Sequence, residues 1–194
     1  MALTGARQYQ KIQDMANSDP LTGLVNKGYF LKDCAQKFKE AQETGKPLSI
    51  AMFDVDNFKH YNDLNGHLSG DQALIAIAEV LRAHGRPRDT VARFGGEEFI
   101  LLMPATAHEV ACELTESIRT AVMESGVEHA EKQPMGFLSI SGGVASVPLH
   151  GTVMAEVIER ADVAMYQAKK TGRNQVVSAS IAASSMEMVS SGDA

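Results

Sequence analysis

The sequence is poor in features that mark several classes of protein. Its 194 residues include two cysteines, Cys34 and Cys112, and no tryptophan. The cysteines lack a metal-ligand spacing such as C-x-x-C, so we expect reduced thiols. No apolar run nears the roughly 20 residues that cross a bilayer, and the N-terminus lacks a signal-peptide pattern. These absences predict a soluble, cytoplasmic protein without a membrane segment.

A surplus of positive charge is also missing. The formal net charge is −6, from 18 Lys and Arg against 24 Asp and Glu. General nucleic-acid binders need basic residues to neutralise phosphates, so the charge balance argues against a nucleic-acid partner. Any phosphate ligand must therefore be bound by local groups.

Internal repeats and linkers rich in Pro or Gly are absent as well. With 44% apolar and 22% charged residues, the chain has an ordinary globular composition, and its length suits one domain with a substantial core. We expect an N-terminal helical linker stub over residues 1–18, one folded domain over 19–177, and a Ser/Ala/Gly-rich disordered tail over 178–194.

Helical and strand patterns alternate along the predicted domain. Apolar spacing and breakers predict helices over Lys27–Thr44, through Ala73–Leu81 to about His84, over His108–Ser125 and over Met154–Lys170. Short apolar runs predict strands at Leu48–Val55, Thr90–Phe94, Glu98–Met103, within Phe137–Val147 and near Asn174–Val177. Gly95-Gly96 indicates a two-residue hairpin turn. The pattern predicts an α/β sandwich with a mixed sheet.

Carboxylates follow two of the predicted strands. Asp54 and Asp56 lie at the carboxyl end of the first long strand, where open α/β sheets present ligand sites, and alternation suggests that one of them points into a site. Glu97 and Glu98 follow the Gly-Gly turn of a hairpin that can lie beside that strand. Crowded carboxylates repel one another unless a cation joins them. Oxygen ligands beside substrate phosphates indicate Mg²⁺ or Mn²⁺ rather than zinc.

Five blocks of sequence match motifs of one known protein family, in the same order along the chain. They are Asp19–Leu24 (DPLTGL), Phe53–Lys59 (FDVDNFK), Asn62–Asp71 (NDLNGHLSGD), Arg93–Phe99 (RFGGEEF) and Ala161–Asn174, with its AD, Y, AK and GRN elements. Together they resemble the GGDEF family of diguanylate cyclases, in its GGEEF form, over nearly the whole predicted domain. The resemblance implies a single-domain fold like the nucleotidyl cyclases and polymerase palms, with a mainly antiparallel central sheet.

The resemblance also implies the metal ligands and the chemistry. Asp54, the backbone carbonyl of Val55 and Glu97 match metal-binding positions, with Glu98 assisting, for two Mg²⁺ or Mn²⁺ ions per site. Such ions neutralise a triphosphate and lower the pKa of the attacking 3′-hydroxyl. Glu97 is the candidate general base, although the sequence does not separate that role from metal binding.

Further matches imply how GTP is bound. Asn62 and Asp71 match positions that read guanine, which suits an amide donor and a carboxylate acceptor. His67 matches another substrate contact, although a His packed at a helix start explains it equally well. The phosphate-binding matches are Lys59, Lys169 and Arg173, with the backbone amides of Asn57 and Phe58.

Arg86 and Asp89 form an R-x-x-D pattern six positions before Gly95. At this offset the family binds its product, cyclic di-GMP, as an inhibitor, and Arg suits phosphate and guanine. Lys27, Tyr61 and Gly142 depart from the family pattern, but none of them removes a group that the mechanism needs.

A product with two equivalent 3′–5′ bonds, made by domains that each bind one GTP, implies a two-fold homodimer. The family usually couples dimerisation to an upstream sensory module. Residues 1–18 are too short to hold one, so we expect either an excised catalytic domain or a short protein activated by other means.

Three alternatives stay open from the sequence. One is a GGDEF-like binding module that has lost turnover, although the signature is intact. Another is a different palm-type nucleotide enzyme, such as an adenylate cyclase or polymerase relative, against which Asn62, Asp71 and the Gly-Gly-Glu-Glu hairpin speak. The third is a purely structural α/β domain.

Overall fold

The computed structural model describes residues 16–181. The helices are α2 (Lys27–Thr44), α3 (Phe58–Asn65), α4 (His67–His84), α5 (His108–Glu124), a short 3₁₀ helix (Ala130–Lys132) and α6 (Met154–Lys170). The strands are β1 (Val25–Asn26), β2 (Leu48–Val55), β3 (Thr90–Arg93), β4 (Glu98–Pro104), β5 (Ile140–Val147) and β6 (Val176–Ser178). None of the helices within residues 16–181 is long and apolar enough to cross a membrane.

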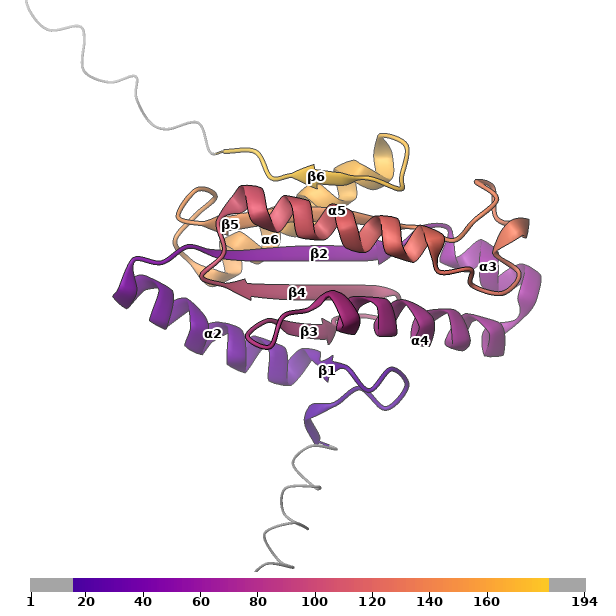
Figure 1. Cartoon of the computed structure of the whole chain (residues 1–194), viewed down its shortest axis with the longest axis horizontal. Helices are drawn as coiled ribbons and strands as arrows, with labels where there is room; N and C mark the ends of the chain where they lie inside the picture. Colours follow the sequence, from indigo (N-terminus) through magenta and orange to yellow (C-terminus); the bar gives the residue numbers. More distant parts are fainter. Residues whose placement is uncertain (1–15, 182–194) are drawn as a thin grey trace, which may run out of the picture.

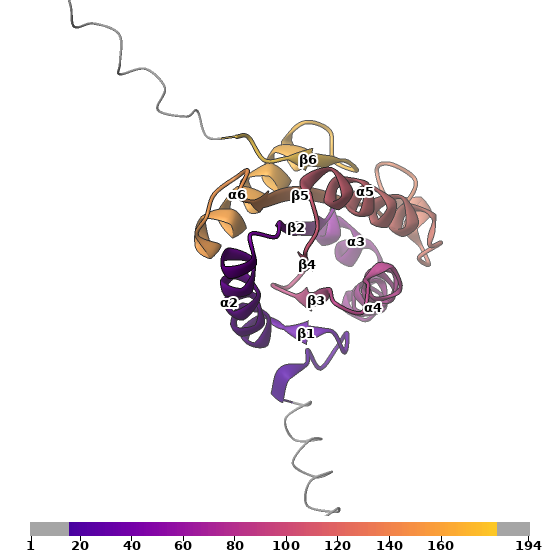
Figure 2. The same ribbon diagram turned by 60° about the vertical axis from the view of Figure 1, so that its left-hand side comes forward.

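One six-stranded sheet, in the order β1-β3-β4-β2-β5-β6, forms the centre of the molecule (Figure 1). Three of its pairings are antiparallel (β3–β4, β4–β2 and β2–β5), and the two outer ones are parallel. Helices α2 and α6 cover one face, and α3, α4 and α5 cover the other (Figure 2). This confirms the predicted α/β fold with a mixed, mainly antiparallel sheet.

Strand β2 is buried on both faces, which explains its continuous apolar run. Ile50 and Met52 pack with α2 and α6, whereas Ala51 and Phe53 pack with α4 and α5. Full burial of each large apolar side chain contributes about 2 kcal/mol. By this alternation Asp54 falls on the α2/α6 face.

Small residues in β5 let α6 lie directly on the sheet. A Cβ atom on Gly143 would come within 2.1 Å of the Ala161 carbonyl oxygen and 2.2 Å of the Met165 nitrogen. The backbone of α6 therefore occupies the space that a side chain would fill. This contact fixes the position of the helix whose last turn carries Lys169.

Capping side chains and glycines with positive φ set the ends of several helices. The Asn26 side chain accepts a hydrogen bond from the Tyr29 N–H and caps α2, and Gly45 ends that helix with a φ of 66°. Gly66, with a φ of 83°, separates α3 from α4, so two helices lie where the apolar spacing indicated one. The sequence also gave no sign of β1, which pairs with β3.

The hairpin prediction was wrong in one detail, because four residues rather than two separate β3 from β4. At the other end of the domain, β6 continues to Ser178, and the side chain of Ala179 is buried, beyond the predicted boundary at residue 177. Residues 182–194 of the predicted tail and residues 1–15 of the predicted N-terminal linker lie outside the described residues.

Candidate active site

Two acidic side chains face each other across the central pair of strands. Asp54 of β2 lies directly opposite Glu98 of β4, in antiparallel register. Asp54 is only 7% exposed, and Glu98 is partly buried. Like charges opposite each other in a sheet are destabilising. The packing of β2 against β4 therefore holds two carboxylates together against their repulsion.

The Gly-Gly turn brings a third carboxylate to the same place. The Glu98 carbonyl accepts from the N–H groups of Phe94 and Gly95, while the Glu97 carbonyl accepts from the Val55 N–H at 3.2 Å. Because the Glu97 carbonyl bonds to β2 rather than to β3, Glu97 belongs to the turn, which is therefore longer than two residues. A Cβ atom on Gly95 would meet Glu98 Oε2 at 2.2 Å, so a side chain at this position would force the Glu98 carboxylate to move.

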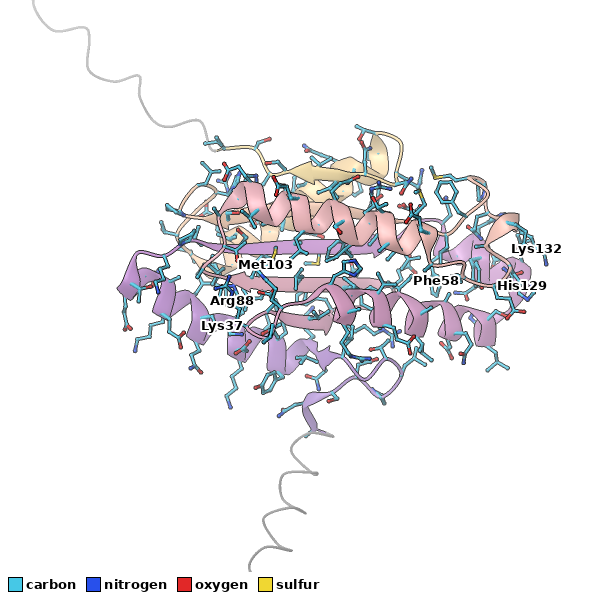
Figure 3. The ribbon with its side chains drawn as sticks, in the orientation of Figure 1. Lys37, Phe58, Arg88, Met103, His129 and Lys132 are labelled. Carbon is cyan, nitrogen blue, oxygen red and sulfur yellow. The ribbon has the colours of Figure 1, made fainter. Side chains whose placement is uncertain are left out.

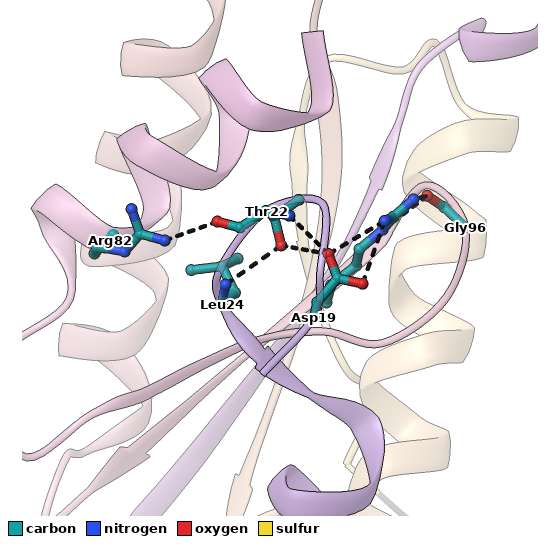
Figure 4. A network of polar contacts seen from close by, with 6 residues as sticks. Asp19, Thr22, Leu24, Arg82 and Gly96 are labelled. Atoms are coloured by element: carbon teal, nitrogen blue, oxygen red, sulfur yellow. Dashed lines mark hydrogen bonds and ion pairs between the residues drawn. The ribbon is translucent and has the colours of Figure 1, made fainter. Parts of the chain in front are cut away.

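Arg93 holds this turn to the N-terminal part of the domain, in a polar network whose members Asp19, Thr22 and Gly96 are labelled in Figure 4. Its guanidinium donates to the Gly96 carbonyl, at 2.7 and 3.2 Å, and pairs with Asp19. Asp19 also accepts from the N–H and hydroxyl of Thr22, each at 2.8 Å. The sequence reasoning gave no role to Arg93 or Asp19, although both lie in the quoted motifs. Their pairing across 74 positions of sequence could not be read from either motif alone.

Lys169 reaches the acidic group from α6. Its ammonium forms an ion pair with the Asp54 carboxylate. Burial raises the pKa of Asp54, Lys169 opposes that rise, and the charges of Asp56 and Asp162 add to it. Burial likewise raises the pKa values of Glu97 and Glu98, and the charge of Asp54 raises both further. Three carboxylates thus share one region that favours added positive charge.

Asp56 has a different environment, although it lies only two positions from Asp54. It is 2% exposed and accepts hydrogen bonds from the Ser139 and Ser141 hydroxyls, each at 2.7 Å, and from the Asn174 N–H at 3.0 Å. Arg173 and Asn174 both have left-handed backbones, with φ of 63° and 46°. Asp56 therefore anchors a strained turn just after α6.

The two residues predicted to read guanine lie on the neighbouring helices α3 and α4. The Oδ1 atom of Asn62 is buried without a hydrogen-bond partner within the described residues. A Cβ atom on Gly70 would lie 1.8 Å from that oxygen, so a side chain at this position would force the Asn62 amide to move. Asp71 follows Gly70 in α4 and is partly buried. An unpartnered amide oxygen is costly unless a ligand satisfies it.

The remaining predicted substrate residues lie on segments around the end of β2. Asn57 has a left-handed backbone, with a φ of 54°, and leads into α3, which begins with Phe58 and the exposed Lys59. His67 is the exposed first residue of α4, and Arg173 is exposed in the turn after α6. The structure pairs Lys169 with Asp54, places Glu98 opposite Asp54 and bonds the Glu97 carbonyl to the Val55 N–H, but it gives no contact from Lys59, His67 or Arg173 to these residues.

Arg86 and Asp89 form a separate cluster at the other end of β3 from the hairpin. Arg86 donates to Asp89 through its backbone N–H, Nε and Nη2, at 3.0, 2.8 and 3.0 Å, and the Asp89 side chain is fully buried. Arg86 also donates to Thr106 Oγ1 at 2.7 Å. On the neighbouring helix Lys37 donates to the Arg88 carbonyl at 3.2 Å, and both residues are labelled in Figure 3.

The donor chemistry near Asp54 suits a hard divalent cation. Within residues 16–181 no three His, Cys, Asp or Glu side chains already form a metal-binding group. The charge of Asp54 nevertheless raises the pKa values of both Glu97 and Glu98, and the charge of Lys169 lowers the pKa values of all three carboxyl groups. Oxygen ligands with excess negative charge are those that Mg²⁺ and Mn²⁺ prefer. These residues therefore fit the implied metal.

Comparison with known proteins agrees with this geometry. The family model described as "Diguanylate cyclase, GGDEF domain" matches residues 16–175. Diguanylate cyclase DgcP of Pseudomonas aeruginosa is 40% identical over 162 residues, which are 83% of this chain and 24% of DgcP. Diguanylate cyclase DgcM of Escherichia coli is 35% identical over 173 residues, 89% of this chain and 41% of DgcM. The chain thus spans less than half the length of these curated relatives.

A solved structure shares the whole architecture. The coiled coil and GGDEF domain of DgcB from Caulobacter crescentus, in complex with c-di-GMP, superposes with a TM-score of 0.82 at 31% identity. The match covers 92% of this chain and 93% of that one. With its sheet order, its carboxylate-bearing hairpin and this match over most of its length, the chain belongs to the GGDEF family.

Proposed function

We propose that this chain is a diguanylate cyclase that condenses two GTP into cyclic di-GMP and releases pyrophosphate. One observation carries the proposal: the Gly-Gly-Glu-Glu hairpin is closed onto the end of β2, so that Glu97 and Glu98 adjoin Asp54. The intact acidic group and the unpartnered amide oxygen of Asn62 support turnover of a nucleotide rather than a purely structural role.

In this proposal Asp54, Glu97 and the Val55 carbonyl hold two Mg²⁺ or Mn²⁺ ions, with Glu98 beside them. When bound, such ions neutralise a triphosphate, polarise its α-phosphate and acidify a nearby hydroxyl. Glu97, whose pKa is raised by burial and by Asp54, is suited to receive the proton of the attacking 3′-hydroxyl.

The surrounding residues bind and orient GTP. Asn62 and Asp71 pair with the guanine edge, and adenine would leave these groups unsatisfied. Lys59, Lys169 and Arg173 bind the terminal phosphates, together with the backbone amides of Asn57 and Phe58 at the start of α3. His67, exposed at the start of α4, makes a further substrate contact.

Catalysis in this proposal needs two chains. Each domain presents one GTP, so that each 3′-oxygen attacks the α-phosphate held by the partner in a two-fold homodimer. An upstream sensory module, if one precedes this segment in a longer protein, would control the pairing. The rate per chain should therefore rise with protein concentration, and a rate independent of concentration would contradict the dimer.

Incubation of the purified chain with GTP and Mg²⁺, followed by mass spectrometry, tests the proposed function. We expect cyclic di-GMP with GTP and no cyclic dinucleotide with ATP. A chain that binds GTP without forming product would be a binding module, and the proposal would fail.

Arg86 and Asp89 are proposed to bind cyclic di-GMP and slow the enzyme. The buried Asp89 carboxylate holds Arg86 in place, and Thr106 fixes it from a second side. Added product should therefore slow synthesis by the wild type. The Arg86→Ala variant should keep its initial rate and lose most of this inhibition, and unchanged inhibition would eliminate the site.

A further inference from the structure

The Asp54 carboxylate has one direct side-chain partner within the described residues, and that partner is a cation. The Asp54 side chain is 10% exposed, and the Lys169 side chain, whose ammonium it binds, is 26% exposed. The two residues are 115 positions apart in sequence. A nearly buried carboxylate needs either hydrogen-bond donors or a counter-ion, because desolvation of an unpaired charge is unfavourable, and the Asp54 side chain is paired with a counter-ion.

The position of Lys169 is built into the fold rather than left to a free side chain. Gly143 lets the backbone of α6 touch β5, and the Asn174 N–H bonded to Asp56 secures the chain after α6. Lys169 lies in the last turn of that helix, where a cation is favoured by the helix dipole. Its ammonium therefore reaches the carboxylate from a fixed base.

The charge of Lys169 acts on the whole acidic group. It lowers the pKa of Asp54 and also those of Glu97 and Glu98. Lys27, which lies 4.2 Å from the centre of the Phe94 ring, has such an effect on Glu98 alone. Among the described cations, Lys169 is the one that counters the charge of all three carboxylates.

We propose that Lys169 is the resident counter-ion of the metal site: its ammonium neutralises Asp54 until a divalent cation binds there, and then transfers to the phosphates of the bound nucleotide. This proposal rests on the proposed function, because it assumes that Asp54 is a metal ligand. Its four-carbon stem gives Lys169 the reach to exchange partners, and its compact ammonium suits both carboxylate and phosphate.

The exchange couples metal binding to nucleotide binding. Without nucleotide, a divalent cation must displace the ammonium from Asp54, and Lys169 then has no phosphate to bind. With nucleotide present, the phosphates receive the ammonium, and the metal binds at a smaller cost. Because such coupling is reciprocal, the metal must favour the nucleotide by the same factor.

The experiment measures Mn²⁺ binding to the purified chain by electron paramagnetic resonance at pH 8, with and without the unreactive analogue guanosine 5′-(α,β-methylene)triphosphate. The variants are Lys169→Met, Lys169→Gln and Asp54→Asn. Arg173→Met is the matched control. Arg173 follows the same helix and is also a predicted phosphate ligand, but it does not contact Asp54. Circular dichroism melting confirms that each variant is folded.

Without the analogue, Lys169→Met and Lys169→Gln should bind Mn²⁺ about tenfold more tightly than the wild type, since the competing charge is gone. Arg173→Met should match the wild type. The analogue should tighten Mn²⁺ binding strongly in the wild type and much less in both Lys169 variants. Equal or weaker binding by the folded Lys169 variants without nucleotide would overturn the counter-ion role.

The Asp54→Asn variant separates the two proposals. It should lose most Mn²⁺ binding under both conditions. If it bound Mn²⁺ like the wild type, Asp54 would not be a metal ligand, and both the metal assignment and the counter-ion proposal would fail. If Asp54→Asn lost binding while the Lys169 variants gained none, only the counter-ion proposal would fail.

Discussion

Asp54 and Asp56, two residues apart at the end of β2, have opposite environments. Asp56 accepts three hydrogen bonds from Ser139, Ser141 and the backbone of Asn174, and it is 2% exposed. Asp54 is nearly as buried but is held by a single ammonium and faces Glu98. These two carboxylates are therefore similar in burial but differ in the kind of partner that each one binds.

The different partners of Asp54 and Asp56 should give the two carboxylates different roles. Neutral donors fixed in the backbone or on short side chains make the Asp56 site rigid, and they hold the strained turn at Arg173 and Asn174. A long, exchangeable cation leaves the Asp54 site ready to accept another positive charge. Changes at Asp56 should therefore affect stability, whereas changes at Asp54 should affect activity.

The largest effect is expected for Asp54→Asn. Loss of a proposed metal ligand should reduce cyclic di-GMP synthesis by about 10³-fold or more. The melting temperature should stay near that of the wild type, because Lys169, which loses its ion pair in the variant, is exposed enough for water to hydrate its ammonium. Steady-state assays and calorimetry check both parts. Near-normal turnover would remove Asp54 from the metal site.

Asp56→Ala should produce the reverse pattern. It leaves two buried hydroxyls and one N–H without their acceptor, and we expect a loss of about 3 kcal/mol of stability. Urea denaturation measures this loss. A variant as stable as the wild type would show that the three hydrogen bonds do not secure the fold.

Ser141→Ala should affect stability in the same direction as Asp56→Ala, but less strongly. It removes one of the three donors and leaves Asp56 with two, so stability should fall by about 1 kcal/mol. Ser141 is also the β5 neighbour of Asp54 in register, yet its hydroxyl does not serve Asp54. Synthesis per folded chain should therefore stay close to that of the wild type, and a selective loss of activity would contradict the separation of the two sites.

The smallest effect concerns Glu97→Gln without metal. The pKa of Glu97 is raised above 4.5, mainly by burial and then by Asp54. The folded state thus binds this proton more tightly than the unfolded chain, so the group's contribution to stability is full below pH 4.5 and is lost as the pH rises through the raised pKa.

The Gln variant should consequently melt slightly above the wild type at pH 7 and match it near pH 4. Saturating Mg²⁺ should stabilise the wild type more than the variant. Melting curves at both pH values, with and without Mg²⁺, check this, and a variant less stable at pH 7 would refute the proposed repulsion among the carboxylates.

Much of the fold was predictable because local pattern and tertiary structure agree. The run Leu48–Val55 is a strand with those bounds, and α6 spans Met154–Lys170 as its periodicity indicated. The longer hairpin was not predictable, because it depends on a contact outside the local sequence, the bond from the Val55 N–H to the Glu97 carbonyl. The apolar spacing also did not show the break at Gly66, which comes from the positive φ of that residue.

The sequence named candidate site residues, but it did not show the contacts between them. The motif match named Asp54, Glu97 and Lys169, yet it placed Lys169 on phosphates and gave no hint of its ion pair with Asp54. Nor could the pattern D-x-D reveal that Asp56 is enclosed by Ser139, Ser141 and Asn174, because these donors come from distant segments. Such pairings are set by how α6 and β5 pack, which no single motif encodes.

The most direct test of the metal site is anomalous diffraction from crystals of the chain with Mn²⁺ and the unreactive GTP analogue. We predict manganese peaks beside the carboxylates of Asp54 and Glu97, with the Lys169 ammonium on the phosphates. Manganese bound elsewhere, with Lys169 still paired to Asp54 in the nucleotide complex, would contradict the proposed catalytic site.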